Sequence, residues 1–431
     1  MMSVVNSYWE STKNKQKVYP VLQGNYETDV TVIGAGFSGL STAYFLAKQG
    51  FKVILVEQNS VGWGASGRNA GMLTTGFKNS IMSLAKKHGM NKAQELLEMS
   101  RDCIKLVDQV AKDEGIDCSI DYKGGLKLAY KEKHFESLKH ENEYMSKNFN
   151  YETEVISASD LKKEIDSPLY NHGALLDMNS FSFHPLNYAI GLSAAAEKYG
   201  TSIYENSKVL SISKKHNKFT VRTHGGSITS ENLVMATNGY STYDTHKGLT
   251  RSLMAIDSHI ITTEPLDTQT FNSILPNNRV ASDTKNFLYY FRKTADQRLL
   301  FGGRVSFGKQ KDSQTDLNLY EILRKNMVGV FPELSSATID YKWAGTTAFT
   351  MDFMPHVGKT NEGVYYLTGY CGHGAAMSTL LGKVISDTIS NESILDNSLS
   401  KLKLETIPFH SQKNLMLNLA ENYMKFKDII S

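Results

Sequence analysis

Six residues near the start of the chain have the types and spacing that suit a bound dinucleotide. They form a GxGxxG pattern between an apolar run and a helical one: Gly34, Ala35, Gly36, Phe37, Ser38 and Gly39. Glycines at these places allow a tight turn, a close approach of backbone to pyrophosphate, and close packing of helix on strand. Free N–H groups and the dipole at the helix N-terminus favour the anion. Glu57 ends the next apolar run, where its carboxylate can accept a hydrogen bond from a ribose hydroxyl. We expect the following residue, Gln58, to contact the cofactor as well.

A glycine-rich loop directly after this second run favours FAD over NAD. It extends from Val61 to Met72, whereas in an NAD dehydrogenase the next helix would usually begin sooner. Such a loop can lie flat against a large planar ring, and its N–H groups and polar side chains can reach phosphates or ring oxygens. We expect these loop residues to contact the cofactor: Gly64, Ala65, Ser66, Arg68, Asn69, Ala70, Gly71 and Met72.

A second glycine cluster, Gly369 to Gly374, lies near the other end of the chain and again stands between an apolar run and a helical one. A helix N-terminus there would stabilise negative charge on a reduced flavin. We therefore expect Gly372, His373 and Gly374 to contact the flavin. His373 would hydrogen-bond the ring or tune its charge.

Arginine and aromatic residues in the second half of the chain are candidates for substrate binding. The chain has only nine arginines, and a planar guanidinium is the usual reader of a carboxylate. Arg292 and Arg304 lie in runs typical of strands, where an ordinary ion pair is the alternative interpretation. Tyr290 shares a strand face with Leu288. An aromatic cage suits a cation or an alkyl amine, and plain sheet packing remains the equal alternative.

The elements that would position these residues indicate an α/β chain. Apolar runs at 29–33 and 52–57 flank a helical pattern at 34–49, which is a βαβ opening. We expect further helices at 81–112, 131–148, 186–199, 317–330 and 375–389. We expect strands at 124–130, 201–204, 209–212, 218–222, 227–229, 233–237, 256–262, 287–293, 298–303 and 364–367, and an irregular segment at 343–358.

Composition excludes several classes of function. The net charge is +3 and the lysines are scattered, so we expect no nucleic-acid partner. We find no apolar stretch that would span a membrane and no apolar signal region. The three cysteines form no CxxC pair, which predicts free thiols, a reducing and therefore cytoplasmic compartment, and no metal site.

Four stretches taken together resemble the D-amino-acid-oxidase-like superfamily of FAD-dependent oxidoreductases. They are residues 32–39, 64–71, 236–239 and 369–374. The leader 7–24, the stretch 290–304 and the stretch 343–358 are most similar to its gamma-glutamylputrescine oxidase-like branch. The resemblance implies that cofactor contacts extend to Val209, Thr237, Asn238, Gly239 and Gly345. It also implies a catalytic site that contains Tyr290, Arg292, Trp343 and His373.

The resemblance also implies an architecture and a reaction. We expect a discontinuous Rossmann-like FAD-binding domain at 1–85, 152–246 and 342–431, and a substrate domain with an antiparallel sheet at 86–151 and 247–341. A small primary or secondary amine, gamma-glutamylputrescine-like, would pass a hydride from its C–N carbon to flavin N5. The imine would hydrolyse to an aldehyde plus ammonia or an amine, and oxygen or another acceptor would take the electrons.

Departures from relatives keep alternatives open. Sarcosine-oxidase relatives often carry a flavin-linking cysteine near 345–350, where this chain has threonines and alanine, so we expect non-covalent FAD. The lysine that follows their glycine cluster is replaced here by Ala375, and the lysine that assists oxygen is missing near Leu299. The alternatives are a D-amino-acid dehydrogenase or N-methyl amino acid (sarcosine-type) oxidase, and a non-catalytic flavin electron-transfer subunit. The oligomeric state is not predicted.

Overall fold

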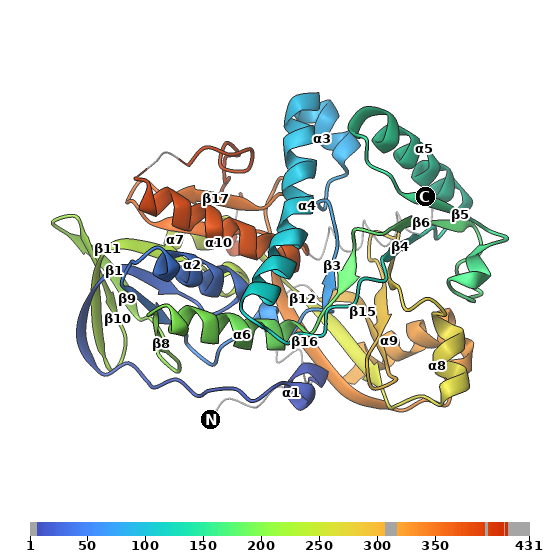
Figure 1. Cartoon of the computed structure of the whole chain (residues 1–431), viewed down its shortest axis with the longest axis horizontal. Coiled ribbons are helices and arrows are strands. Elements are labelled where there is room, and N and C mark those ends of the chain that lie inside the picture. Colours follow the sequence, from blue (N-terminus) through green and yellow to red (C-terminus); the bar gives the residue numbers. More distant parts are fainter. Residues whose placement is uncertain (1–6, 307–316, 393–394, 409, 413–431) are drawn as a thin grey trace.

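Two eight-stranded sheets lie beside each other and carry most of the other elements (Figure 1). A computed structural model describes residues 7–306, 317–392, 395–408 and 410–412. The first sheet has the strand order β17 (His356–Lys359), β18 (Tyr365–Thr368), β11 (Gly226–Met235), β1 (Gly24–Ile33), β2 (Val53–Val56) and β8 (Ser202–Tyr204). β10 (Lys218–Arg222) and β9 (Ser211–Lys215) extend from β11. The five strands from β18 to β8 are parallel, so their carboxyl ends meet at one edge.

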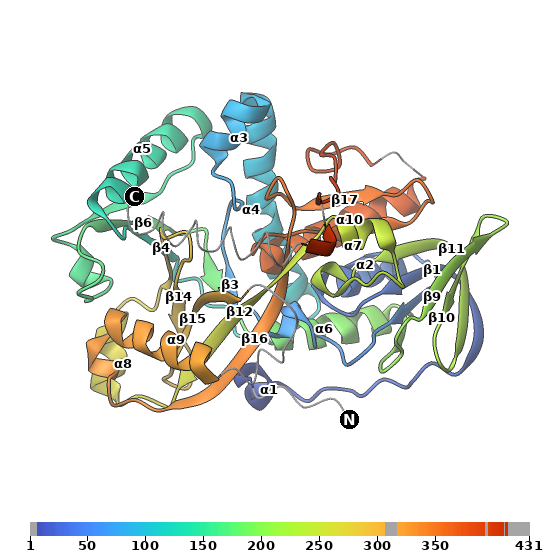
Figure 2. The same cartoon turned by 180° about the vertical axis from the view of Figure 1, so that it is seen from behind.

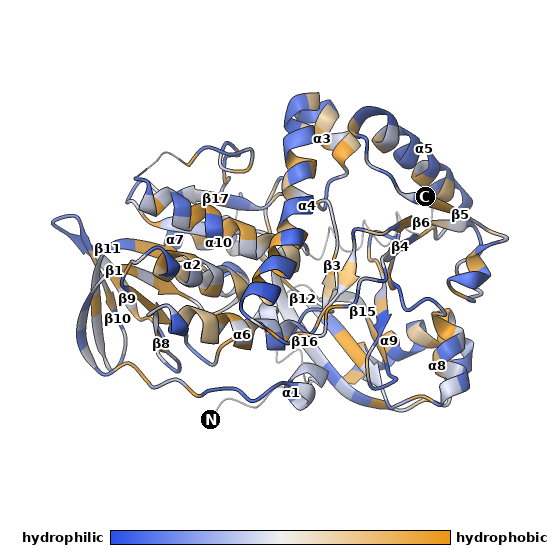
Figure 3. Ribbon diagram, viewed as in Figure 1, coloured by the Kyte–Doolittle hydropathy of each residue, from blue (hydrophilic) through white to orange (hydrophobic). Residues whose placement is uncertain are grey.

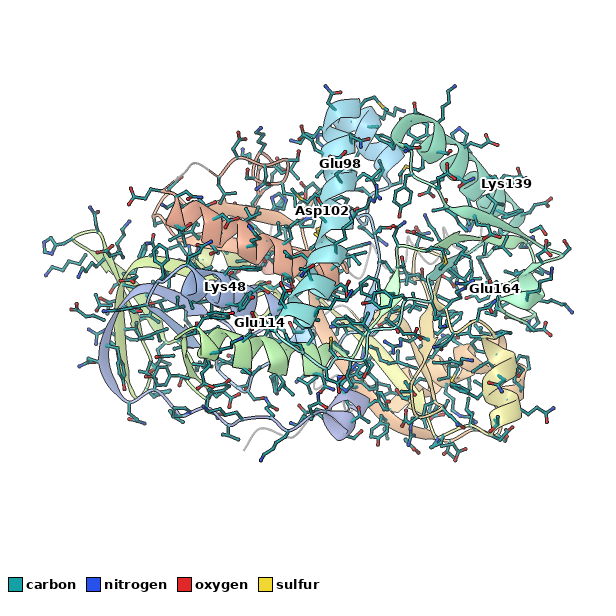
Figure 4. All side chains as sticks on the ribbon, in the orientation of Figure 1. Lys48, Glu98, Asp102, Glu114, Lys139 and Glu164 are labelled. Atoms are coloured by element: carbon teal, nitrogen blue, oxygen red, sulfur yellow. The ribbon has the colours of Figure 1, made fainter. Side chains whose placement is uncertain are left out.

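Helices cover one face of the first sheet. α2 (Phe37–Lys48) lies between α10 (Gly374–Ser390) and α6 (Pro185–Lys198), and α4 (Met90–Asp113) crosses α10 (Figure 1). Glu114, which ends α4, joins two of these helices: Lys198 is 2.9 Å and Lys48 is 3.8 Å from its carboxylate (Figure 4). Figure 3 shows apolar residues concentrated in the strands beneath the helices, and polar ones along α4 and α5 (Glu132–Phe149).

The second sheet contains β16 (Ile339–Phe349), β12 (Met254–Thr263), β15 (Leu299–Ser306), β14 (Tyr290–Lys293), β13 (Val280–Asp283), β4 (Gly125–Leu128), β6 (Gly173–Asp177) and β5 (Glu154–Ser157), in that order. All neighbours are antiparallel except β13 and β4, which are parallel. α9 (Leu317–Val330) packs on β12 and β15. Figure 2, which views the molecule from behind, shows α9 on the near side of these strands. The expected α/β fold with a Rossmann-type part is confirmed.

The remaining elements are short. They are α1 (Tyr8–Thr12), α3 (Ile81–His88), α7 (Lys247–Arg251), α8 (Thr268–Ile274), the paired strands β3 (Met72–Leu73) and β7 (Phe181–Ser182), and single 3₁₀ turns at Ala65–Gly67, Leu161–Lys163, Asn238–Tyr240, Pro332–Leu334 and His410–Gln412. No helix among the described residues has the length and apolar character that crossing a membrane requires.

Several expected elements are corrected. The helix expected at 81–112 is two helices, because Gly89 lies between them at φ 88°. Residues 343–349 are not irregular: they continue β16, which pairs with β12 over its length. The strands expected at 227–229 and 233–237 are one strand, β11, since β1 pairs with both parts. β14 begins at Tyr290, so the expected alternation over 287–289 does not occur. In the strands, tertiary pairing outweighs the local pattern.

The proposed domain division stays a prediction, and sheet membership differs from it in three places. β5 and β6 fall within the 152–246 range yet belong to the second sheet, as does β16 near the 341/342 boundary. α4 falls within 86–151 yet packs on α10 over the first sheet. Residues 413–431 of the last range lie outside the described residues. Pairing between strands that are distant in the sequence decides which sheet each strand belongs to, and the local sequence of a strand does not indicate its partner.

Candidate active site

A cavity of about 430 Å³ lies between the carboxyl edge of the first sheet and the second sheet. At one end it is lined by residues after β2 and β8, namely Glu57 and Val209. At the other end it is lined by His373, which follows β18. Because β18 and β8 are at opposite ends of the parallel strand order, these residues mark two separate ends of the cavity. Ligands of open α/β sheets bind at this edge.

The GxGxxG turn fits a close approach of backbone to ligand. Gly34 has φ 105°, and a Cβ there would lie 2.9 Å from the carbonyl oxygen of Ala236. A Cβ on Gly36 would lie 2.9 Å from Ser66 Oγ, and one on Gly39 would lie 1.8 Å from the Gly34 oxygen. Gly36 is the N-cap of α2 and lines the cavity, so the helix N-terminus opens onto it.

Glu57 is held by backbone donors. Its carboxylate accepts hydrogen bonds from the N–H of Ala35 at 2.8 Å and the N–H of Asn59 at 2.9 Å. Burial raises the pKa of Glu57, and these two donors partly offset that effect. The side chain still lines the cavity, so it retains acceptor capacity for a ligand hydroxyl.

Arg68 places a guanidinium in the wall of the cavity. Its Nε donates to the carbonyl of Trp63 at 2.7 Å, and its carbon Cζ lies 4.0 Å from the centre of the Trp63 ring. Nη1 donates to Ala344 at 3.3 Å, whereas Nη2 is buried and has no partner among the described residues. Asn69 instead folds the loop, since its Oδ1 accepts from the N–H of Gly71 at 2.8 Å.

Two buried indoles hold this loop from outside. Trp343 Nε1 donates to the carbonyl of Arg68 at 2.9 Å, and Trp9 Nε1 donates to the carbonyl of Asn69 at 2.8 Å. Trp343 is fully buried and does not line the cavity. It is therefore placed as a positioning residue, and the expected direct catalytic contact is not seen.

The second glycine cluster brings three side chains to the cavity. His373 is the N-cap residue of α10, its Nδ1 has no partner among the described residues, and burial lowers its pKa to about 4. Cys371 lies in the left-handed region at φ 51°, and burial raises its pKa to about 11. The hydroxyl of Tyr370 shares a 2.7 Å hydrogen bond with Ser38, which ties this cluster to α2. Near neutral pH the histidine is uncharged and the cysteine is a thiol.

Two of the three guanidinium nitrogens of Arg292 donate to backbone carbonyls. Its Nη1 donates to the carbonyls of Gly71 at 2.6 Å and Phe183 at 2.9 Å, and its Nε donates to the carbonyl of Lys293. The side chain is buried and does not line the cavity. Backbone carbonyls therefore take the donors of Nη1 and Nε, and the role of Arg292 in the catalytic site stays a prediction. The side chain of Arg304 lies outside the described part of the chain.

Most of the predicted site residues converge on this cavity. Those that line it are Gly34, Gly36, Phe37, Ser38, Glu57, Gln58, Gly64, Ala65, Ser66, Arg68, Asn69, Ala70, Met72, Val209, Thr237, Asn238, Tyr290, Gly345, Gly372, His373 and Gly374. Those that do not line it are Ala35, Gly39, Gly71, Gly239, Arg292 and Trp343. The glycines among these pack the backbone: for example, a Cβ on Gly71 would lie 2.4 Å from the carbonyl oxygen of Phe183.

Sequence reasoning missed several lining residues. Tyr240 lies over Gly64, where a Cβ would be 3.1 Å from its ring, and forms an edge contact with Trp63 at 5.7 Å. Ser258 shares a 2.8 Å hydrogen bond with the hydroxyl of Tyr290. Lys78 also lines the cavity. The only signal for Tyr240 was its place one residue after Gly239; Ser258 and Lys78 gave none.

Comparison with known proteins identifies the family. A family model described as FAD dependent oxidoreductase (DAO) matches residues 29–388. The chain belongs to the DAO family of FAD-dependent oxidoreductases. It is 35% identical over 430 residues to "Probable oxidoreductase OrdL" of Haemophilus influenzae, covering 98% of this chain and 97% of that protein. It is 33% identical over 393 residues to gamma-glutamylputrescine oxidoreductase of Escherichia coli, covering 91% of this chain and 90% of that protein.

The fold of this DAO-family enzyme is also that of a solved structure. The crystal structure of glycine oxidase from Geobacillus kaustophilus matches it with a TM-score of 0.73 at 21% identity, covering 88% of this chain and all of that one. The residues present fit FAD. A Cβ on any glycine of the GxGxxG turn would collide with neighbouring atoms. Arg68 Nη2 and His373 Nδ1, which have no partner among the described residues, both belong to side chains that line the cavity. Buried polar atoms are nearly always bonded in complete assemblies, so a polar ligand is expected between them.

Proposed function

We propose that this FAD-dependent enzyme oxidises the C–N bond of a small primary or secondary amine of the gamma-glutamylputrescine type. When bound, FAD supplies the hydride acceptor for this chemistry. The observation that carries the proposal is the cavity's second end, beyond His373, where Tyr290, Ser258 and Phe287 line it. Glu57 is the only carboxylate among the described lining residues, and it is at the opposite end. The second end therefore suits an amine in its neutral form, which is the reactive one.

Tyr290 and the residues around it would orient the amine. A Cβ on Gly302 would lie 2.0 Å from the Tyr290 ring, so the glycine on β15 is what allows the ring to lie flat across that strand. Ser258 fixes the other end of the side chain through the hydroxyl. Phe287 and Leu288 add apolar surface that excludes water from the alkyl part of an amine. Restricting the orientation of the reacting carbon is the main task this arrangement performs.

We propose that the cofactor is held non-covalently by the cavity residues that precede α2, by Glu57, by the 64–72 loop and by the N-terminus of α10. Thr347 and Ala348 line the cavity where sarcosine-oxidase relatives often carry a flavin-linking cysteine. Cys371 lines it too, but its Sγ donates to the carbonyl of Gly369 at 3.0 Å. Burial also raises the pKa of this thiol to about 11, which makes it a poor nucleophile.

The alternatives are less well supported. An α-amino acid carries its carboxylate one bond from the reacting carbon, and sarcosine carries it three bonds from its N-methyl carbon, so both need a carboxylate reader close to the reacting carbon. Nη1 of Arg292, the candidate clamp, already donates to two backbone carbonyls. A non-catalytic electron-transfer subunit would need no substrate cavity, whereas here the cavity extends past the cofactor cradle to the second sheet. The relative that is 33% identical, gamma-glutamylputrescine oxidoreductase, supports the amine assignment.

Anaerobic mixing of the yellow holoenzyme with single amines tests the proposal. The visible absorbance of the flavin is followed with gamma-glutamylputrescine, putrescine, sarcosine, glycine and several D-amino acids. Fast bleaching by gamma-glutamylputrescine is the expected result, and admitting air afterwards reports whether oxygen is an acceptor. Bleaching only by sarcosine or D-amino acids would replace the proposal with the first alternative. No bleaching of a flavin that dithionite reduces normally would refute amine oxidation by this panel.

A further inference from the structure

The second sheet forms one wall of the cavity, and the lining residues that its described strands contribute are all uncharged. Four of them have hydroxyl groups: Ser258 on β12, Ser282 on β13, Tyr290 on β14 and Thr347 on β16. The hydroxyl of Thr347 already donates to the carbonyl of Ile256 at 3.2 Å. A few polar groups in a ligand cavity usually fix the orientation of the ligand. This wall therefore suits a ligand group that forms hydrogen bonds and carries no charge.

Two hydroxyls of this wall, those of Ser258 and Tyr290, share a hydrogen bond of 2.8 Å. Each hydroxyl has one proton and two lone pairs, and the bond between them uses one of the two protons. Whichever residue donates, one O–H proton remains for a group in the cavity, because no other described residue bonds to either hydroxyl. Burial raises the pKa of the Tyr290 phenol to about 12, so the phenol keeps its proton near neutral pH.

A glycine on the strand between them allows this pair to form. β15 lies between β12 and β14 in the sheet, and Gly302 on β15 is the cross-strand partner of Tyr290. A Cβ on Gly302 would lie 2.0 Å from the Tyr290 ring, so the ring can cross β15 only where that strand has a glycine. The hydroxyl pair is therefore held by three neighbouring strands, which gives it a defined position in the wall.

We infer that the hydroxyl pair of Ser258 and Tyr290 binds an uncharged carbonyl group of the substrate through its remaining O–H proton. This inference rests on the proposed function and specifies a part of the molecule other than the reacting amine. A neutral hydroxyl is a sufficient donor for a carbonyl oxygen, whereas a carboxylate taken out of water needs a charged partner. The substrate class is an aliphatic amine that carries an amide or another neutral carbonyl further along its chain.

The pair lies at a distance from the second glycine cluster. On β16, the carbonyl of Ala348 accepts the N–H of Cys371 in that cluster at 3.0 Å, and Gly345 is the cross-strand partner of Ser258. Three residues of a strand, such as those from Gly345 to Ala348, span about 10 Å. The cofactor is proposed to contact the N-terminus of α10, which follows the cluster. An amine that reacts there and a carbonyl that reaches the pair must therefore belong to an elongated molecule.

Two amines of equal chain length test this inference in the holoenzyme. N-acetylputrescine contains an amide, whereas n-heptylamine has methylene groups in its place, and the dissociation constant of each comes from the substrate dependence of anaerobic flavin reduction. Tyr290→Phe and Ser258→Ala each remove one hydroxyl of the pair. We expect the variant that lacks the hydroxyl in contact with the carbonyl to bind N-acetylputrescine about five- to tenfold more weakly than the wild type, and the other variant to show a smaller loss. Both variants should bind n-heptylamine as the wild type does.

Tyr289→Phe is the matched control, since it removes a tyrosine hydroxyl from the neighbouring position. The ring of Tyr289 packs on Phe301 with 5.3 Å between the ring centres, and Tyr289 does not line the cavity. The affinity of this variant for N-acetylputrescine, relative to n-heptylamine, should match that of the wild type. The inference is overturned if neither Tyr290→Phe nor Ser258→Ala lowers this relative affinity, or if Tyr289→Phe lowers it to the same extent.

An amide without an amine separates this inference from the proposed function. N-butylacetamide has the amide and the butyl chain of N-acetylputrescine, and its binding to the holoenzyme is measured by ligand-observed NMR titration. We expect the wild type and Tyr289→Phe to bind it about five- to tenfold more tightly than the more affected of the two pair variants. If this result holds while no amine reduces the flavin, the proposed function fails and the pair still binds a carbonyl. Binding that neither Tyr290→Phe nor Ser258→Ala weakens would refute the role of the pair, whatever the amines do.

Discussion

The buried His184 should make the protein less stable in mild acid. Burial, and the nearby charge of Arg292, lower the pKa of His184 to about 4, from an ordinary value of 6.5. Its Nδ1 accepts the N–H of Asn187 as the N-cap of α6. Its Nε2 lies 3.1 Å from Thr12 Oγ1 on α1, so the side chain joins the leader to α6.

The direction in which stability changes with pH follows from proton binding at His184. Between these two pKa values the unfolded chain binds a proton at His184 that the folded chain does not, so stability falls as pH falls below the unfolded value. Each pH unit in this window costs about 1.36 kcal/mol, so lowering the pH from about 7.5 to about 5 should remove about 2 kcal/mol. The loosened leader carries Trp9, which bonds the loop at Asn69, so flavin release should accompany the loss.

The assay is the unfolding free energy in urea, followed by tryptophan and released-flavin fluorescence at several pH values. His184→Asn is the control, because asparagine keeps an N-cap acceptor but does not titrate. The variant loses the ring contact with Trp9, at 4.8 Å, which lowers its stability by an amount that does not depend on pH. The difference between wild type and variant should shrink by about 2 kcal/mol over that range. A difference that stays constant with pH would refute the reasoning.

Two further substitutions test how the cofactor is held. Glu57→Gln replaces an acceptor of the Ala35 and Asn59 N–H groups with an amide, which should raise the dissociation constant for FAD about tenfold. Titration of the apoprotein by flavin fluorescence measures it, and an unchanged constant would remove Glu57 from the cofactor site. Trp343→Phe removes the donor to the Arg68 carbonyl and should cost about 1–3 kcal/mol of stability. FAD should then leave faster in thermal scans; weaker amine binding with unchanged FAD retention would instead indicate direct contact with substrate.

The parts of the site that the sequence predicted are those that local spacing determines. A GxGxxG turn between a strand and a helix has one compact geometry, and all three of its glycines are positions where a Cβ would come within 3 Å of another atom. Helix patterns with a clear apolar stripe were equally predictable, and α9 occupies the 317–330 range that was expected. These features depend on residues a few positions apart.

What the sequence did not reveal depends on contacts between distant segments. The alternation around Tyr290 predicted a strand face but not its partner, Ser258, which is 32 positions away. Arg292 has the residue type of a carboxylate reader, yet its acceptor Gly71 is 221 positions away. The role of a charged side chain depends on which acceptors lie close to it in the folded protein, and the order of residues in the sequence does not show this.

The 64–72 loop, which lines the cavity, is fixed mainly by donors from outside the first sheet. Three carbonyls within four residues each accept a buried donor from α1 or from the second sheet. The pairs are Trp343 with Arg68, Trp9 with Asn69 and Arg292 with Gly71. Unpairing a buried carbonyl costs about 1–3 kcal/mol, so loss of any of these donors should loosen the loop. Flavin retention is therefore the measurement that separates these positioning residues from a residue proposed to touch the substrate, such as Tyr290. Loss of Tyr290 should change the proposed amine oxidation while FAD stays bound.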